Sequence, residues 1–299
     1  MKPKVLLVAD IPNWAYDFRC NALWKHLGDR YEFAKAYMTR MPDFDYALFD
    51  VLYYAGFMLP GSPRDRANAD RRKVVTSISG IRTRKISDVK EKLEKTCTAA
   101  AAVNKDLYEM FRDADGVKVD LVYNGVDCDL FSPGPRPEHK DFIIGWAGRQ
   151  KKKVTNIKRL DQLARTVESI PGARLDLRIF DKKVPHESMP EFYRGLDCYC
   201  CVSMNEGHSN TVSEAAACGV PVISTPSGTA SELLADGGIL LKEDLSDLRE
   251  ALMSIMASTP EHRADAGTRL RQYVVENWDW KNQAAKYGEL FDYVLREAK

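Results

Sequence analysis

Short apolar runs alternate with amphipathic segments along the chain. Runs of strand length predict strands at 4–9, 46–51, 73–77, 97–103, 119–123, 142–146, 174–180, 196–203, 220–224 and 238–241. Between them, apolar residues recur with helical spacing, for example at 156–169, 210–218, 245–257 and 280–298. Strands that are apolar on both sides and alternate with helices are typical of parallel sheets covered on both faces. The pattern therefore predicts the α/β class.

The segment 131–138 interrupts this alternation. It holds three prolines and one glycine in eight residues, so it cannot continue a helix or a strand. We therefore expect two Rossmann-like, doubly wound domains, over 1–131 and 138–280, and a C-terminal helix over 281–299 that packs back towards the N-terminal domain. Because ligands of such sheets bind beyond the carboxyl ends of the strands, the two domains should face a central cleft.

Composition changes this picture little. The chain has 44 basic and 43 acidic residues, so its overall charge favours neither nucleic acid nor a membrane surface. We find no apolar run long enough to span a membrane and no signal peptide at the N-terminus. Seven cysteines, most of them in apolar runs, indicate a reducing compartment, and we expect a cytoplasmic protein. Cys198 and Cys201 lie on opposite faces of an expected strand, so we expect neither a metal nor a redox role for them.

The most informative stretch runs from Glu206 to Ile223. It follows an expected strand, turns at Gly207 and enters a helix of small residues that Ser209 or Asn210 can cap. Free N–H groups at a helix start form an anion site that suits a phosphate. Two carboxylates nearby, Glu206 and Glu214, suit hydrogen bonds to sugar hydroxyls. The alternative is that these acids only complement the helix dipole, and their spacing alone leaves both interpretations open.

This pattern, E-G-x6-E-A-x-A-C-G-x-P-V-I, resembles the signature of family 4 of the retaining glycosyltransferases, which have the GT-B fold. Further motifs carry the same resemblance: 123–127 with 131–133 (N-G-V-D…F-x-P), 145–149 (G-x-x-G-R), Tyr193 with Asp197, 225–232 (T-x-x-G-x-x-E) and 278–280. The match covers about 119–299. Residues 1–118 match only in the general Rossmann pattern, over a shortened N-terminal domain.

The resemblance implies a nucleotide-sugar donor site in the second domain. By position, Glu214 would bind the ribose hydroxyls and Glu206 those of the donor sugar. The backbone around Gly207–Asn210 would meet the diphosphate. Thr211 and Gly148 would belong to the same donor site, and His208 lies between the two glutamates, where a donor contact outweighs a purely structural role.

Catalysis would depend on cations. The resemblance implies that Arg149 neutralises the diphosphate together with a lysine, either Lys158 or, as the fallback, Lys153. Two cations and a helix start can stabilise the leaving diphosphate without a metal, so we expect no cofactor and no metal site. Two D-x-D triplets, at 43–45 and 127–129, have the form used by metal-dependent transferases of another fold, and we reject them.

The N-terminal domain departs from the family pattern. The first loop lacks the usual glycine pair, and its Trp14 either walls the cleft or belongs to the core. Ser79 stands where the family often has a histidine, which leaves the activation of the acceptor open. Eleven basic and five acidic residues lie between 64 and 95, Arg82 among them, on the acceptor side of the expected cleft. They form either a solvated face or a site for an anionic acceptor such as nucleic acid or a phospholipid surface.

The leading hypothesis is a retaining, metal-independent glycosyltransferase that moves a sugar from a nucleotide-sugar donor to an unidentified acceptor. One alternative is the same chemistry on a nucleic-acid base or another anionic acceptor. The other is a transferase-like binding module that has lost catalysis, which the missing histidine and the short first domain favour. The sequence does not identify the nucleotide, the sugar, the acceptor or the oligomeric state.

Overall fold

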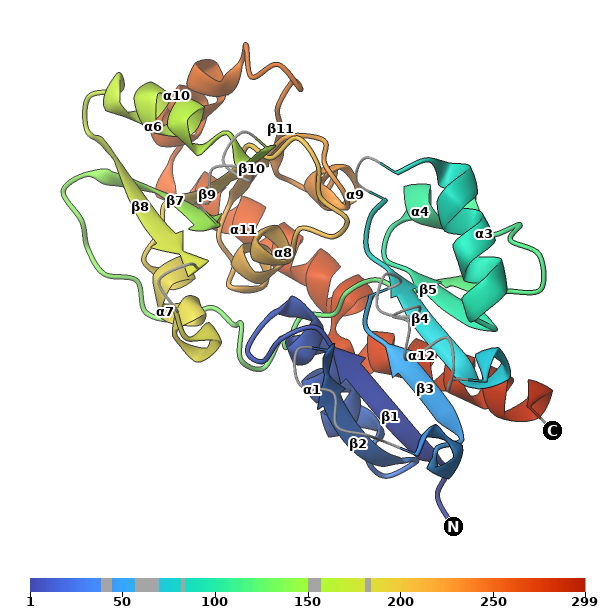
Figure 1. The fold of residues 1–299 in the computed structure, drawn as a ribbon. Helices are drawn as coiled ribbons and strands as arrows, with labels where there is room; N and C mark the ends of the chain where they lie inside the picture. The colour runs from blue at the N-terminus through green and yellow to red at the C-terminus, as the bar shows by residue number, and fades with distance from the viewer. Residues whose placement is uncertain (39–44, 57–69, 82–83, 150–156, 181–183, 299) are drawn as a thin grey trace. The chain divides into compact units, whose positions relative to one another are not determined.

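A computed structural model describes the chain except for residues 39–44, 57–69, 82–83, 150–156, 181–183 and 299. The chain forms two compact units, one of Met1–Gly125 with Trp280–Lys299 and the other of Val126–Asp279. Each unit is a parallel sheet that carries helices (Figure 1). This architecture confirms the predicted α/β class.

The first unit contains a sheet with the strand order β2-β1-β3-β4-β5-β6. Its strands are β1 (Lys4–Ala9), β2 (Glu32–Tyr37), β3 (Val51–Tyr54), β4 (Val74–Ile78), β5 (Ala99–Ala102) and β6 (Lys118–Leu121). Helices α1 (Ala15–Leu27) and α12 (Trp280–Glu297) bury their apolar sides in one core cluster. Helices α3 (Ile86–Thr96) and α4 (Lys105–Phe111) contribute to a second cluster on the other face.

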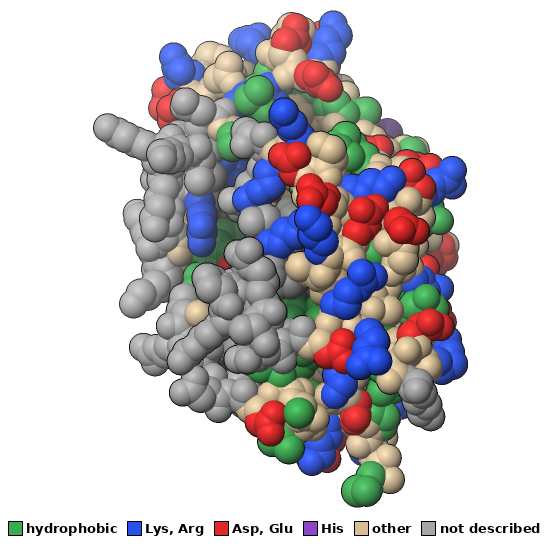
Figure 2. Space-filling model, turned by 45° about the vertical axis from the view of Figure 1, so that its right-hand side comes forward, with side chains coloured by type: hydrophobic (Ala, Val, Ile, Leu, Met, Phe, Trp, Pro, Cys, Tyr) green, Lys and Arg blue, Asp and Glu red, His purple; other side chains and the backbone are tan. Residues whose placement is uncertain are grey.

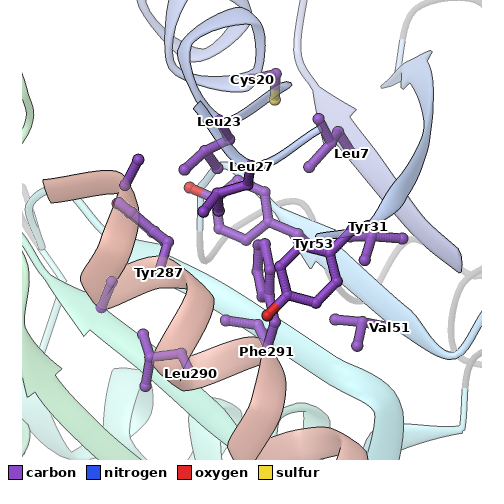
Figure 3. Close-up of a cluster of buried hydrophobic side chains, with 14 of the residues drawn as sticks. Leu7, Cys20, Leu23, Leu27, Tyr31, Val51, Tyr53, Tyr287, Leu290 and Phe291 are labelled. Carbon is purple, nitrogen blue, oxygen red and sulfur yellow. The ribbon is translucent and has the colours of Figure 1, made fainter. Parts of the chain in front are cut away.

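Aromatic side chains hold the last helix on the first unit (Figure 3). Tyr53 on β3 meets Tyr287 and Phe291 of α12 edge to face, at centroid distances of 5.5 and 5.7 Å. The hydroxyl of Ser77 lies 2.8 Å from that of Tyr53 and 3.0 Å from that of Tyr287. These bonds satisfy the buried hydroxyl groups within the apolar cluster. Helix α12 therefore belongs to the core of the first unit, although more than half of the chain separates it from the other residues of that unit.

The second unit contains a sheet with the order β11-β10-β9-β7-β8. Its strands are β7 (Phe142–Gly148), β8 (Ala173–Ile179), β9 (Cys198–Cys201), β10 (Val222–Ser224) and β11 (Ile239–Leu240). Helices α6 (Leu160–Glu168) and α10 (Leu248–Ala257) share one apolar cluster with this sheet. Helix α8 (Asn210–Ala217) packs on β9 and β10 and contacts α7 (Met189–Arg194) and α11 (Pro260–Trp278), while α9 (Ala230–Leu234) lies beside β10 and β11.

The two sheets share one topology. In each, the strand that comes first in the chain lies between the second and the third, so the winding direction reverses beside it. The reversal falls between β1 and β3 in the first unit and between β7 and β9 in the second. Ligands of open α/β sheets bind beyond the carboxyl ends of the strands at such a point.

The chain passes between the units at Gly125–Val126 and returns at Asp279–Trp280. The Val126 N–H donates to the Trp278 carbonyl over 2.8 Å, and a Cβ on Gly125 would lie 2.3 Å from the Trp280 ring, so only glycine fits there. This boundary precedes the expected one at 131 because the following residues pack on the second unit. Arg271 donates to the Phe131 carbonyl over 3.0 Å, for example.

In the first unit one strand expectation fails and one strand was missed. The strand expected at 46–51 is wrong, because Asp45 accepts a bond from the Ala47 N–H over 3.0 Å and starts a 3-10 turn at Tyr46–Leu48. The strand begins only at Val51, which pairs with Val5. Strand β2 was not expected, because this edge strand has only two fully buried residues and an alternation weakened by Lys35.

Charges of both signs are interspersed on the face drawn in Figure 2. Several cations of the basic stretch between 64 and 95 have acidic partners: Arg72 pairs with Asp70 at 2.8 Å, Lys90 with Asp113 at 2.9 Å, and Lys95 with Glu91. For these cations the solvated-face interpretation holds. No helix in the described part of the chain is long and apolar enough to cross a membrane.

All seven cysteines are unpaired and buried. Cys20 and Cys97 lie in the first unit, and Cys128, Cys198, Cys200, Cys201 and Cys218 in the second. Burial raises the pKa of each thiol, to about 12 for Cys20 and Cys97. Buried protonated thiols act as small apolar groups and are poor nucleophiles.

Candidate functional site

The second unit gathers polar residues at its reversal point. Strand β7 ends at Gly148, and the half-buried Arg149 follows directly. Strand β9 ends at Cys201, and the loop after it carries Glu206 before α8 begins at Asn210. The carboxyl ends of the two strands that flank the reversal therefore deliver Arg149 and Glu206 to one edge of the sheet.

Lys158 reaches this edge from a turn that precedes α6. Arg159 adopts a left-handed conformation (φ 50°), which is unusual for a residue with a side chain. Its guanidinium donates to the Val202 carbonyl over 2.6 Å, and the Met204 N–H donates to the Ile157 carbonyl over 2.9 Å. These contacts tie the turn to the loop after β9 and bring Lys158 next to Glu206.

Lys158 and Glu206 form an ion pair, with 24% and 18% of their side chains exposed. Burial opposes the charge on Lys158, but the Glu206 carboxylate outweighs it, and the pKa of Lys158 is raised above its ordinary value. The lysine is therefore a permanent cation at neutral pH. Of the two lysines that the sequence left open, Lys158 lies at the glutamate, whereas Lys153 lies outside the described residues.

Gly228 supports the Glu206–Gly207 backbone. It has a φ of 63°, and a Cβ at this position would lie 2.8 Å from the Gly207 carbonyl oxygen and 2.9 Å from that of Glu206. Only a glycine permits both the left-handed backbone and this close approach. The glycine of the 225–232 motif thus has a structural role, because it lets the loop that carries Glu206 pack closely against residue 228.

Glu214 is held on both sides of its carboxylate. Oε2 accepts a bond from the buried Tyr193 hydroxyl over 2.8 Å, and Oε1 lies 3.0 Å from His186 Nε2. Burial opposes the charge on His186, but the bond to Glu214 outweighs it, so the pKa of His186 is raised above its ordinary value. A carboxylate oxygen can accept more than one hydrogen bond, so two partners fix its plane and leave lone pairs for hydroxyl donors.

His208 points into the protein. Its Nε2 lies 3.0 Å from the Ser213 hydroxyl and its Nδ1 3.3 Å from that of Thr229, and the ring meets Trp278 edge to face at 5.0 Å. The buried ring therefore braces the loop between the two glutamates. This arrangement favours the structural role over the expected donor contact through the ring.

Helix α8 starts at the same edge. Ser209 occupies its N-cap position, but the Ser209 hydroxyl approaches the Ser227 carbonyl at 3.5 Å rather than capping the helix. Asn210 and Thr211 form the first turn and are half-buried. The amide groups of this turn and the cations Arg149 and Lys158 belong to one edge of the sheet, and such a set suits a phosphate group.

No group of three His, Cys, Asp or Glu side chains with metal-binding geometry occurs in the described ranges. The Asp127–Asp129 triplet lies at the start of the second unit, where the Asp127 side chain accepts a hydrogen bond from the Leu130 N–H over 3.2 Å and so stabilises the local turn. Residues 43 and 44 of the other triplet lie outside the described residues.

Two of the expected acceptor-side residues, Trp14 and Ser79, lie at the corresponding edge of the first unit. Trp14 is half-buried at the N-cap position of α1, and Arg82 lies outside the described residues. The Ser79 hydroxyl accepts a bond over 3.2 Å from Arg19, a buried residue of α1. Arg19 also donates to the Ala55 carbonyl over 2.7 Å and to the Asn124 side chain. Ser79 is thus the partner of a buried cation.

Sequence reasoning missed His186 and Arg19. His186 lies in a short turn after β8, where a single histidine beside a proline gives no recognisable pattern. Arg19 lies on a helix with other polar residues and looks like a surface cation in the sequence. Both depend on contacts between residues far apart in the chain.

Residues 142–258 match the family described as glycosyl transferases group 1. A GDP-mannose-dependent alpha-(1-6)-phosphatidylinositol monomannoside mannosyltransferase of Mycolicibacterium smegmatis is 28% identical over 122 residues, which is 38% of this chain and 32% of the relative. The D-inositol 3-phosphate glycosyltransferase of the same organism is 25% identical over 186 residues, which is 50% of this chain and 42% of the relative. The matches thus span about a third to two fifths of these curated relatives.

Solved structures resemble the chain over nearly its whole length. Sucrose-phosphate synthase from Thermosynechococcus elongatus superposes with a TM-score of 0.74 at 12% identity, covering 99% of this chain and 100% of that one. Anabaena HepE in complex with UDP-glucose gives 0.74 at 14% identity, covering 97% and 99%. At this identity the likeness concerns the fold. Residues 142–258 are therefore a glycosyltransferase group 1 domain, in a chain with the GT-B fold.

Proposed function

We propose that this protein is a retaining glycosyltransferase that moves a sugar from a nucleotide-sugar donor to an acceptor without a metal. The observation that carries the proposal is the edge beyond β7 and β9, where two carboxylates, two cations and a helix start gather within the group 1 domain. Similar proteins include a GDP-mannose-dependent mannosyltransferase and a D-inositol 3-phosphate glycosyltransferase.

In this proposal Glu214 accepts hydrogen bonds from the ribose hydroxyls. Its plane is fixed by Tyr193 and His186, so little conformational freedom is lost when the donor binds. Glu206 would receive hydroxyls of the donor sugar while Lys158 turns towards the diphosphate. The Lys158–Glu206 ion pair supports this assignment, because a donor that binds there would meet a cation and a carboxylate together.

Breaking the glycosyl–phosphate bond puts negative charge on the leaving diphosphate. Arg149, Lys158 and the first amides of α8 would stabilise that charge in the transition state. Since these groups are already cations or fixed dipoles, the step needs no metal. We further propose that the acceptor attacks from the face that the diphosphate leaves, which retains the anomeric configuration. The seven unpaired thiols support a cytoplasmic location.

The proposal is tested first by thermal shift against UDP, GDP, ADP, CMP and their common sugar conjugates. A ligand of the native state raises the unfolding midpoint. We expect one nucleoside diphosphate to give a clear shift that Glu214→Gln abolishes. Glu191→Gln, which makes the same change at an exposed position of α7, is the control and should keep the shift.

The same ligand then permits a test of mechanism without the natural acceptor. Slow hydrolysis of the donor should continue in EDTA, and proton NMR of the first sugar released should show the donor's anomeric configuration. An inverted sugar would contradict retention, and loss of hydrolysis in EDTA would contradict metal independence. If no nucleotide shifts the midpoint, the protein is a binding module that has lost donor chemistry.

A further inference from the structure

A polar cavity lies in the first unit, at the amino ends of β4, β5 and β6. Its volume is about 540 Å³, within the usual range for sites of small ligands. It lies at the opposite edge of the sheet from Ser79 and Arg19. Its lining consists of Arg71, Arg72, Thr98, Ala114, Gly116, Val117 and Lys118, with Tyr293 and Glu297 from the end of α12.

Three cations and one carboxylate line this cavity. Arg72 forms a two-pronged pair with Asp70 at 3.0 and 2.8 Å, and Lys118 lies 3.3 Å from Asp120. Arg71 differs from both. Its guanidinium contacts the Gly116 carbonyl at 3.3 Å, and no carboxylate of the described residues pairs with it. The charge of Arg71 is therefore available to a ligand, in contrast to the paired cations elsewhere in the basic stretch.

The local structure fixes the backbone that presents Arg71. Asp70 caps the 3-10 turn at Arg71–Lys73, and the Thr98 hydroxyl donates to the Arg71 carbonyl over 3.0 Å. Gly116 has a φ of 64°, and a Cβ there would lie 3.3 Å from the Arg71 guanidinium. Lys118 Nζ lies 5.5 Å from the centre of the Tyr293 ring, so a cation and an aromatic surface lie together in the same lining.

We propose that this cavity binds a phosphate-bearing anion through Arg71 and Lys118, as a ligand site separate from the donor site. Arginine offers a planar pair of donors that matches two phosphate oxygens, and lysine adds a point charge. Glu297 is the opposing charge in the lining, and its removal should strengthen binding. The phosphate group can come from a soluble phosphorylated compound or from a phospholipid headgroup. The proposal does not depend on the proposed transferase activity.

Calorimetric titration with inorganic pyrophosphate at low salt tests the soluble source. We expect saturable binding that weakens about tenfold in the double variant Arg71→Ala, Lys118→Ala and falls with added salt. The matched control is Arg112→Ala, which removes an exposed arginine of the same unit and should bind as the wild type does. Arg149→Ala removes a cation of the candidate donor site, and the binding that depends on Arg71 and Lys118 should persist in this variant.

Two further measurements keep the test decisive. Glu297→Gln removes the carboxylate of the lining and should tighten binding. Because poor folding cannot strengthen binding, this variant still tests the site if the double variant folds poorly. Flotation with phosphatidylcholine vesicles, with and without phosphatidylglycerol, tests the lipid source. Binding only to the anionic vesicles, with the same dependence on Arg71 and Lys118, assigns the phosphate to a headgroup. The proposal is overturned if neither probe binds, if the double variant binds both unchanged, or if Arg149→Ala alone abolishes binding.

Discussion

The two sheets of this protein share one strand order but present different chemistry at their reversal points. Beyond β7 and β9, Glu206 pairs with Lys158 and Glu214 with His186, and all four side chains are partly exposed. Beyond β1 and β3, the polar group is Arg19, which is only 3% exposed. Its guanidinium donates hydrogen bonds to the Ala55 carbonyl and to the side chains of Ser79 and Asn124.

The difference shows that topology provides the position for a ligand, whereas the side chains decide whether that position can bind one. Topology places the ends of neighbouring strands at one edge and so creates a position for a ligand. In the second unit, charged groups at that position retain hydrogen-bonding capacity for a ligand. In the first unit, the arginine ties together the segments that follow β3, β4 and β6 and serves the fold. The following predictions test this contrast, from the largest expected effect to the smallest.

Replacement of Arg19 should cause the largest loss of stability. Arg19→Met leaves the Ala55 carbonyl and the Asn124 amide without their donor, and we expect unfolding free energy to fall by about 2–4 kcal/mol. Urea denaturation measures the change, with exposed Arg112→Ala as the control. A loss below about 1 kcal/mol would mean that Arg19 does not organise this edge.

Replacement of Arg149 should act on rate rather than on stability. Because its charge matters most as the diphosphate leaves, Arg149→Ala should lower donor turnover about 100-fold while donor affinity changes much less. Steady-state kinetics of donor hydrolysis separate the two effects. Arg165→Ala, at an exposed position of α6, should behave like the wild type. An unchanged turnover number would remove Arg149 from the catalytic site.

Gly228→Ala tests the support of the Glu206 loop. The added methyl group would press against the Gly207 carbonyl at 2.8 Å and strain a left-handed backbone, which costs about 1–2 kcal/mol. We expect nucleotide affinity to fall about tenfold. The control is Gly172→Ala, because Gly172 also has a positive φ (77°) but lies directly before β8. It should lose stability without losing affinity, and equal affinity losses in both would contradict the assignment.

The His186–Glu214 pair should give a small dependence on pH. The pKa of His186 is raised in the folded protein, so its stabilising charge is fully present below the ordinary value of 6.5 and is lost as pH rises through the raised value. We therefore expect the wild type to lose about 1 kcal/mol of stability above pH 6.5 relative to His186→Gln. Urea denaturation across this pH range provides the measurement. The exposed His262→Gln should show the wild-type dependence, and a flat difference would refute the pairing.

The sequence predicts most strands, including the edge strands β6, β8 and β11, but it misplaces the buried strand β3 and misses the edge strand β2. Strand β1 has the predicted bounds because its side chains are apolar on both faces, and a short run of this kind is typical of a central strand covered on both sides. Strand β2 escapes notice because an edge strand keeps polar residues such as Lys35. The same holds at the site. The motif with Glu206 and Glu214 is local and visible in the sequence, whereas His186 and Arg19 gain their partners only when distant segments meet.

The seven buried thiols give each unit an internal reporter of opening. A thiol with a raised pKa and no exposure reacts with an alkylating reagent only after the surrounding core opens. Cys20 and Cys97 then record opening of the first unit, while Cys198 and Cys200 record that of the second. Timed alkylation followed by peptide mass analysis would thus measure the opening rates of both cores in one unmodified chain. A ligand bound to either unit would slow labelling in that unit alone.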